Sequence, residues 1–211
     1  MTGFRIFLSA TRPGVSECLD SPTTGLRTLG IVRNEGAGWI LRRCVMSILV
    51  TYGSERGGTA GLARMVAEAL QSAGQTADVV PARQVKSLEG YDAVVVGGAL
   101  YAFRWHRDAR RFVKHHTTEL RKVPTFFFSS GPLDDSALKR EIPPVKGVQA
   151  LMDRVGAKKH ITFGGRLAPD VKGFPASAMA KKYAGDWRDS KQVRDWVSTI
   201  DFELRARAAR V

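Results

Sequence analysis

The sequence contains little cysteine, and none of its apolar runs is long. Of its 211 residues only two are cysteine, Cys18 and Cys44, and both precede Met46. A disulfide framework, a cysteine-based metal site and a cysteine nucleophile are therefore not expected, and no metal is assigned. No apolar stretch reaches the roughly 18 residues of a membrane-spanning helix. The segment from Phe4 to Ala10 is too short for a signal peptide, so the expected location is the cytoplasm.

Acidic side chains are also in the minority. The chain has 33 Lys and Arg against 20 Asp and Glu, which gives a formal net charge of +13. A positive net charge says nothing about the fold but indicates a negatively charged partner. Three classes of partner fit: nucleic acid, an anionic membrane surface, and an acidic small substrate. The basic residues are spread over many segments and no nucleic-acid-binding motif accompanies them. Nucleic acid is therefore not expected as a partner.

The first 45 residues differ in composition from the rest. They contain Arg but no Lys, are rich in Gly, Thr and Ser, and show no persistent amphipathic period. Their strand-like pieces, Arg5 to Leu8 and Leu29 to Val32, have no obvious partner. We interpret residues 1–45 as a low-order N-terminal extension outside the native domain, and residues 46–211 as the folded domain. The alternative is a genuine regulatory or membrane-directed arm.

From Met46 onward, strand patterns and helix patterns alternate. Apolar runs of strand length are expected at Ser47–Tyr52, Ala77–Val80, Tyr91–Gly98, Pro124–Ser129 and His160–Phe163. One-face apolar spacing predicts helices at Ala60–Ala73, Arg107–Arg121, Gly147–Val155 and in a last segment capped by Ser190. This alternation predicts an α/β fold: a doubly wound, five-stranded parallel sheet with helices on both faces. Ligands bind beyond the carboxyl ends of the strands in such sheets, where three loops should meet: Gly53–Thr59, Gly97–His106 and Ser129–Asp135.

The first of these loops has the chemistry of a phosphate site. Its residues are Ser54, Glu55, Arg56, Gly57, Gly58 and Thr59. The two hydroxyls can donate to phosphate oxygens, the glycines allow the backbone to come close, and the following helix presents its positive end. A nucleotide-triphosphate loop is excluded because no Gly-Lys-Ser/Thr ends the turn, and the Gly-x-Gly-x-x-Gly dinucleotide spacing is absent. The alternative is an ordinary tight strand-to-helix turn.

The second and third loops have the chemistry of a site for a flat ring. The candidate residues of the second loop are Gly98, Ala99, Leu100, Tyr101, Phe103 and Trp105, and those of the third are Ser129, Ser130 and Gly131. Glycine lets a ring lie close to the backbone, and the aromatic residues supply stacking faces. The third loop offers N–H groups and hydroxyls to a polar ring edge. For each aromatic side chain the alternative is a place in the core under the loop.

Several strings of this sequence resemble the flavodoxin-domain family. They are the first loop, in which Arg56 departs from the family's hydroxyl residue, and the strings Leu88 to Gly97, Phe112 to His116 and Gly185 to Asp189. The resemblance covers Met46 to Ile200 and is closest to the branch that contains the menaquinone-dependent protoporphyrinogen dehydrogenase. It implies a flavodoxin-like fold, with residues 46–211 binding FMN by its phosphate at the first loop and by its ring at the other two. It also implies oxidation of a porphyrinogen with a quinone as acceptor.

One departure from that branch concerns the membrane. The branch carries a long apolar, basic insertion after its fifth strand, whereas Leu167 to Gly185 is short and only mildly apolar here. Peripheral contact with the inner face of the membrane is therefore an open alternative to a purely cytoplasmic location.

The expected activity is that of an FMN-dependent oxidoreductase. No Ser-His-Asp set or pair of carboxylates stands out, and no catalytic side chain is assigned, because a flavin carries the redox chemistry itself. His106 is the histidine expected near the ring. A basic rim of Arg56, Arg104 and Arg107 is expected to favour anionic flavin and to attract carboxylates, such as those of a porphyrinogen. The alternatives are an electron carrier without its own substrate and a flavodoxin-like interaction module with a degenerate site.

Overall fold

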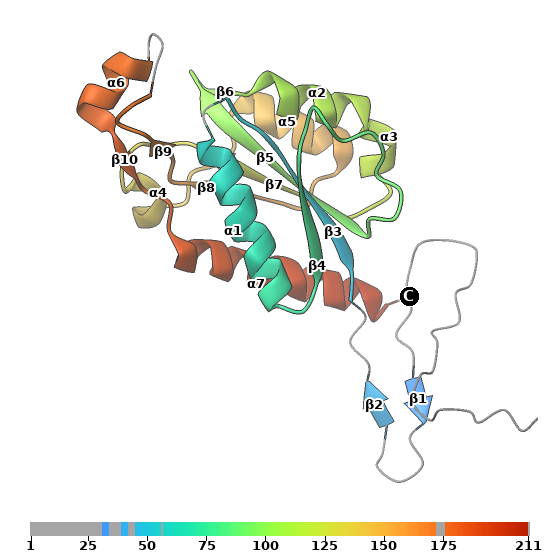
Figure 1. The fold of residues 1–211 in the computed structure, drawn as a ribbon. Coiled ribbons are helices and arrows are strands. Elements are labelled where there is room, and N and C mark those ends of the chain that lie inside the picture. Colours follow the sequence, from blue (N-terminus) through green and yellow to red (C-terminus); the bar gives the residue numbers. More distant parts are fainter. Residues whose placement is uncertain (1–30, 34–38, 42–44, 56, 172–175, 211) are drawn as a thin grey trace, which may run out of the picture.

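The structure is a computed structural model of the chain. It describes residues 31–33, 39–41, 45–55, 57–171 and 176–210. The predicted α/β architecture is confirmed: helices pack on both faces of a parallel sheet (Figure 1).

The sheet has five parallel strands, and the three central ones are buried on both faces. Its members are β3 (Ser47–Gly53), β4 (Thr76–Pro81), β5 (Ala93–Tyr101), β7 (Thr125–Ser130) and β8 (Lys159–Phe163). They pair in parallel in the order β4-β3-β5-β7-β8. The apolar runs at the centres of β3, β5 and β7 are fully buried, which is why they show no polar alternation. Because β4 lies on one side of β3 and the later strands lie on the other, the winding reverses between β3 and β5. Ligands bind at such a point.

Two hydrophobic cores lie on the two faces of this sheet. One contains residues of α1 (Gly58–Ser72) and α7 (Ser190–Ala208), and Figure 1 shows both helices on the same side. The other contains residues of α2 (Arg107–His115), α3 (Thr117–Leu120) and α5 (Lys146–Val155). Two shorter helices, α4 (Ser136–Lys139) and α6 (Ala176–Tyr183), follow β7 and β8. Within the described residues, no helix combines the length and the apolarity needed to cross a bilayer.

The second predicted loop is in part a hairpin. Strand β5 continues to Tyr101 and turns back into β6 (Arg104–Trp105), with Leu100 opposite Trp105 and Tyr101 opposite Arg104. The prediction ended the strand at Gly98 and assigned the residues from Gly97 to His106 to a loop. The strand continues because its last residues find an antiparallel partner that the apolar pattern does not reveal.

Two helix boundaries also differ from the prediction. The segment expected as one helix from Arg107 to Arg121 is divided at His116, where the hydroxyl of Thr117 donates to the carbonyls of Val113 and Lys114 at 2.9 Å each. The last helix is capped by Asp189 and not by Ser190, because the Asp189 carboxylate accepts from the Gln192 N–H at 2.6 Å.

Part of the N-terminal extension forms a pair of strands. Strand β1 (Ile31–Arg33) pairs antiparallel with β2 (Trp39–Leu41), so the expectation that Leu29 to Val32 has no partner was wrong. The partner segment was not recognised as a strand in the sequence. The other strand-like piece, Arg5 to Leu8, lies outside the described residues. A further short pair, β9 (Arg166–Leu167) with β10 (Gly185–Asp186), encloses α6 between β8 and α7.

Candidate functional site

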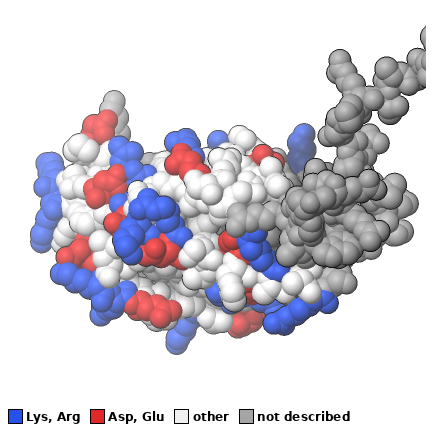
Figure 2. Space-filling model, turned by 90° about the horizontal axis from the view of Figure 1, so that it is seen from below, with Lys and Arg blue, Asp and Glu red and all other residues white. Residues whose placement is uncertain are grey.

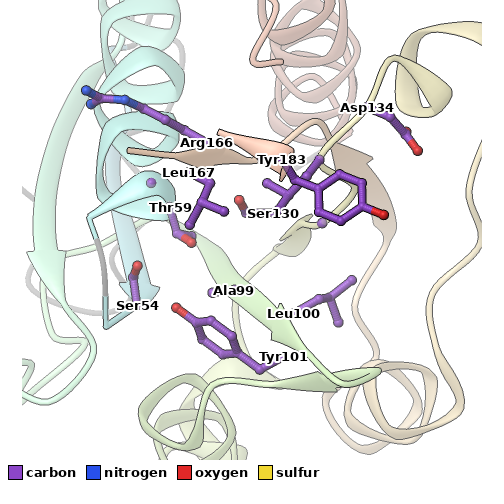
Figure 3. A pocket seen from close by; sticks show the side chains of 14 residues that line it. Ser54, Thr59, Ala99, Leu100, Tyr101, Ser130, Asp134, Arg166, Leu167 and Tyr183 are labelled. Carbon is purple, nitrogen blue, oxygen red and sulfur yellow. The ribbon is translucent and has the colours of Figure 1, made fainter. Parts of the chain in front are cut away.

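The three loops meet, as predicted, at the carboxyl ends of β3, β5 and β7. They surround a cavity of about 360 Å³, which lies within the range of roughly 300–1,000 Å³ of small-molecule sites (Figure 3). We call it the first cavity. Its lining comprises Ser54, Gly58, Thr59, Ala99, Leu100, Tyr101, Ser130, Gly131, Leu133, Asp134, Gly165, Arg166, Leu167 and Tyr183.

One end of the first cavity has the features of an anion site. Figure 3 shows the hydroxyls of Ser54 and Thr59 at this end, beside the start of α1. The N-cap residue Gly57 has a φ of 77°, and in the described part of the chain no side chain caps the helix and no acidic residue lies in its first turn. The buried Ser54 Oγ has no hydrogen-bond partner among the described residues. A helix start with uncapped N–H groups and an unpartnered hydroxyl suits the oxygens of a phosphate.

The rest of the first cavity is more apolar. Leu100, Leu133 and Leu167 lie along its walls, and the phenol rings of Tyr101 and Tyr183 border it from β5 and α6 (Figure 3). Polar groups come from the third loop, through Ser130 and Gly131. Apolar walls with phenol rings and a polar edge suit a flat heteroaromatic ring.

Residues 185–189 support one wall of the first cavity, and the sequence did not predict this wall. The Arg188 guanidinium donates to the Asp186 carboxylate at 2.7 Å and holds the pKa of that carboxyl below its usual range. Asp186 also lies 3.8 Å from Nε of Arg166, which lines the cavity. A Cβ on Gly61 of α1 would collide with Arg188, so this string packs directly against the first helix. Asp186 thus links Arg166 to a segment that packs against α1.

A second cavity, of about 570 Å³, lies beside the first and shares Ser54 and Tyr101 with it. Its lining comprises Tyr52, Ser54, Glu55, Pro81, Ala82, Arg83, Tyr101, Arg104, Trp105, His106, Arg107, Asp108 and Arg110. Arg104 and Arg107, expected at the rim of the ring site, lie here, as does Glu55 of the predicted phosphate loop. Arg56 lies outside the described residues.

Three of the predicted ring contacts are packing residues under the second loop. Trp105 is only 2% exposed, and its indole N–H donates to the Ser129 hydroxyl at 2.8 Å. That hydroxyl lies 2.9 Å from Nε2 of His160, whose pKa burial lowers to about 4. A Cβ on Gly98 would overlap the Trp105 ring, so this glycine makes room for the indole. For Gly98, Trp105 and Ser129 the expected contact with a flat ring is therefore corrected to a role in the core, because the hairpin turns the indole inward.

Two further expectations for the second loop differ from the structure. Phe103 is 84% exposed at the tip of the β5–β6 hairpin and does not line the first cavity. His106 caps α2, because its Nδ1 accepts from the Asp108 N–H at 3.3 Å, and its ring meets that of Tyr101 edge-on with centroids 6.1 Å apart. Its place is therefore the second cavity, behind Tyr101, and not the lining of the first.

The sequence interpretation missed the residues that close the first cavity from beyond β8. These are Gly165, Arg166, Leu167 and Tyr183, whereas Leu133 and Asp134 belong to the predicted third loop. One signal was present: Gly164-Gly165 follows a strand just as Gly97-Gly98 lies near the end of another. A Cβ on Gly165 would lie 3.0 Å from the carbonyl oxygen of Gly131, so this glycine allows a fourth loop to approach the third. Among the described residues, no three His, Cys, Asp or Glu side chains are grouped as metal ligands would be.

The order of the strands and the anion site at the first strand-to-helix turn define a class of protein, the flavodoxin-like nucleotide-binding α/β domains. The model of the flavodoxin-domain family matches residues 49–182, more than half of the chain. The chain therefore belongs to the flavodoxin-domain family, and FMN is the cofactor that this domain indicates.

Individual relatives agree with this family. Protoporphyrinogen IX dehydrogenase [quinone] of Escherichia coli strain K12 is 31% identical over 86 residues, which cover 40% of this chain and 48% of the relative. The chain thus spans about half the length of the curated relatives it matches. Among solved structures, rubredoxin oxygen:oxidoreductase of Desulfovibrio gigas has a TM-score of 0.53 at 14% identity, over 76% of this chain and 36% of that one. A variant of the flavo di-iron protein of Thermotoga maritima has a TM-score of 0.50 at 14% identity, over 75% and 35%. These structures share the fold.

Proposed function

We propose that this flavodoxin-like oxidoreductase oxidises a porphyrinogen and passes the electrons to a quinone. The observation that carries the proposal is the first cavity, in which an uncapped helix start and the unpartnered Ser54 hydroxyl adjoin walls suited to a flavin ring. The substrate and the acceptor are those named in the E. coli relative. The excess of basic residues supports an anionic substrate.

The residues of this chain would divide the binding of FMN between them. Ser54, Thr59 and the N–H groups at the start of α1 would hold the phosphate, whose charge the helix dipole favours. Ala99 to Tyr101 and Ser130 to Gly131 would border the ring. FMN, when bound, supplies the redox chemistry, and the protein supplies its position, its electrostatics and access for the substrate.

The decisive experiment is anaerobic turnover by the FMN-loaded protein. Protoporphyrinogen IX and a water-soluble menaquinone analogue are mixed with it, and porphyrin fluorescence is followed over time. The proposal expects porphyrin to form only when enzyme, FMN and quinone are all present. FMN-loaded protein that forms no porphyrin above the enzyme-free rate contradicts the proposed substrate. An electron carrier without its own substrate would show two separated one-electron flavin potentials and no turnover.

Contact with a membrane surface is part of the same proposal, since a long-chain quinone resides in the bilayer. The exposed Phe103 and the adjacent Arg104 at the hairpin tip form the aromatic and basic pair that suits a lipid–water interface. On the face shown in Figure 2, by contrast, Lys and Arg groups alternate with Asp and Glu groups, so that face offers no continuous basic area. Sedimentation with anionic vesicles tests this part, and Phe103→Ser is expected to lower the bound fraction.

A further inference from the structure

The second cavity contains more positive charge than its own carboxylates neutralise. Four arginines line it, Arg83, Arg104, Arg107 and Arg110, against the two carboxylates Glu55 and Asp108. Asp108 is already engaged, because it lies 3.7 Å from Arg107 and 3.8 Å from His106.

Among the described residues, the other three arginines of this cavity have no acidic neighbour within ion-pair distance. Within the described part of the chain, the guanidinium groups of Arg83, Arg104 and Arg110 form no ion pair and no hydrogen bond, and the Nε of Arg110 is buried without a partner. A buried donor without an acceptor costs free energy, and a ligand oxygen removes that cost. Guanidinium groups pair with carboxylates through parallel N–H bonds, so this set of donors suits a ligand with carboxylate groups.

The wall of the cavity fits the body of such a ligand. The phenol rings of Tyr52 and Tyr101 line it together with the arginines, so it offers aromatic surface next to positive charge. Tyr101 and Ser54 border both cavities and therefore stand between this space and the first cavity. A ligand that enters the second cavity comes next to whatever the first cavity holds, with Tyr101 as the shared wall.

We propose that the second cavity is a carboxylate-binding subsite, which anchors the acidic groups of the substrate beside the first cavity. Arg83 and Arg104 bind carboxylate oxygens at its mouth, Arg110 does so at its inner wall, and the aromatic side chains contact the apolar part of the ligand. This inference rests on the proposed function, since it assigns the place where an acidic substrate is held.

The test measures binding, so that it does not depend on turnover. Mesoporphyrin IX, a stable dicarboxylate, is titrated into FMN-loaded protein by calorimetry, and the double variant Arg83→Gln/Arg104→Gln is compared with wild type. Each lost charge contact is expected to weaken mesoporphyrin binding about tenfold. The control is Arg111→Gln, an exposed arginine of α2 next to Arg110 that does not line the cavity, which should change the affinity less than about twofold.

The ligand itself supplies a second control. The diamide of mesoporphyrin IX has the same ring without the carboxylates, and its affinity should be nearly equal in wild type and in the double variant. Inorganic phosphate at equal ionic strength should compete poorly, because it lacks the apolar body. If both porphyrins bind the double variant as tightly as they bind wild type, or if the control variant loses as much affinity, the subsite is refuted. Failure of the proposed function looks different: acid-specific binding persists, while porphyrinogen turnover is absent.

Discussion

Helices α1 and α2 begin at the same edge of the sheet but use their first N–H groups in opposite ways. At α1 the N-cap is Gly57, no described side chain caps the helix, and no acidic residue lies in its first turn. At α2 the His106 ring accepts from the Asp108 N–H, and the Asp108 carboxylate lies in the first turn. The uncapped start faces the first cavity, while the capped one faces the second, where arginines supply the positive charge. Of these two helices, α1 therefore has the start with N–H groups available to an anion, whereas at α2 a side chain already accepts from them.

The strongest way to break this contrast is to give α1 the carboxylate that it lacks. Gly57→Asp places a negative charge at the N-cap, and a Cβ there meets nothing within 4 Å. Because this charge occupies the positive end of the helix and repels the phosphate, FMN affinity is expected to fall about a hundredfold, measured by quenching of flavin fluorescence.

The matched control for that change is Gly57→Asn. Asparagine has the same shape and suffers the same backbone strain at a φ of 77°, but it carries no charge. Equal affinity losses in the two variants would mean that shape and not charge governs the loop. Circular dichroism should show both variants folded, since either residue also caps a helix well.

The strands and the first loop were predictable from the sequence, whereas the cap of α2 by His106 was not, and the reasons are physical. Strands buried on both faces must be apolar throughout, so the centres of β3, β5 and β7 were located correctly. A glycine-rich turn without Lys leaves few ligand classes, so the sequence also predicted a ligand site at this turn, and Ser54, Gly58 and Thr59 do line the first cavity. Both features are local, and local chemistry decides them.

The features that were missed depend on contacts distant in the sequence. Whether Trp105 faces a ligand or the core is set by the register of the β5–β6 hairpin, which pairs it with Leu100. Tyr183 reaches the first cavity from α6, and neither periodicity nor spacing connects that helix with the loops. The aromatic residues of the second loop indicated a binding site for a flat ring. They could not indicate which of these side chains face a ligand and which face the core.

The layer beneath both cavities provides a pH-dependent test. His160 bonds Ser129, which also binds Trp105 of the second cavity and precedes Ser130 of the first. Burial lowers the pKa of His160 from 6.5 to about 4. Between these two pH values the His160 imidazole is therefore protonated in the unfolded chain and neutral in the folded chain. This contribution to stability is complete above pH 6.5 and is lost as the pH falls towards 4, by about 3 kcal/mol in all.

Comparison with His160→Gln isolates this effect from the titration of the carboxylates. Glutamine keeps a hydrogen-bonding group near Ser129 but does not titrate. The difference in unfolding free energy between wild type and variant, obtained from urea melts between pH 7 and pH 4, is expected to shift against wild type as the medium becomes acidic. A difference that is constant with pH would show that His160 titrates alike in both states.

A smaller effect is expected at Thr59, inside the anion site. Thr59→Val keeps the shape of this buried side chain but removes the hydroxyl that faces the phosphate position. FMN affinity should fall about tenfold, because one hydrogen bond to a charged group is lost. Thr59→Ser retains the hydroxyl and should bind FMN nearly as wild type does. If the Thr59→Val and Thr59→Ser variants bind FMN with the same affinity, the helix N–H groups bind the phosphate without help from the hydroxyl.

The smallest effect is expected at the tip of the hairpin between the two cavities. Ala102 and Phe103 have φ values of 45° and 60°, although Asn-Gly is the pair that such a turn favours. Replacing both, as Ala102→Asn/Phe103→Gly, should relieve backbone strain and raise the unfolding free energy by about 1 kcal/mol in urea melts. Since Phe103 does not line the first cavity, FMN affinity should stay unchanged. A variant that is more stable but binds FMN more weakly would show that the exposed phenyl ring moves onto the flavin, which would make the hairpin a mobile part of the first cavity.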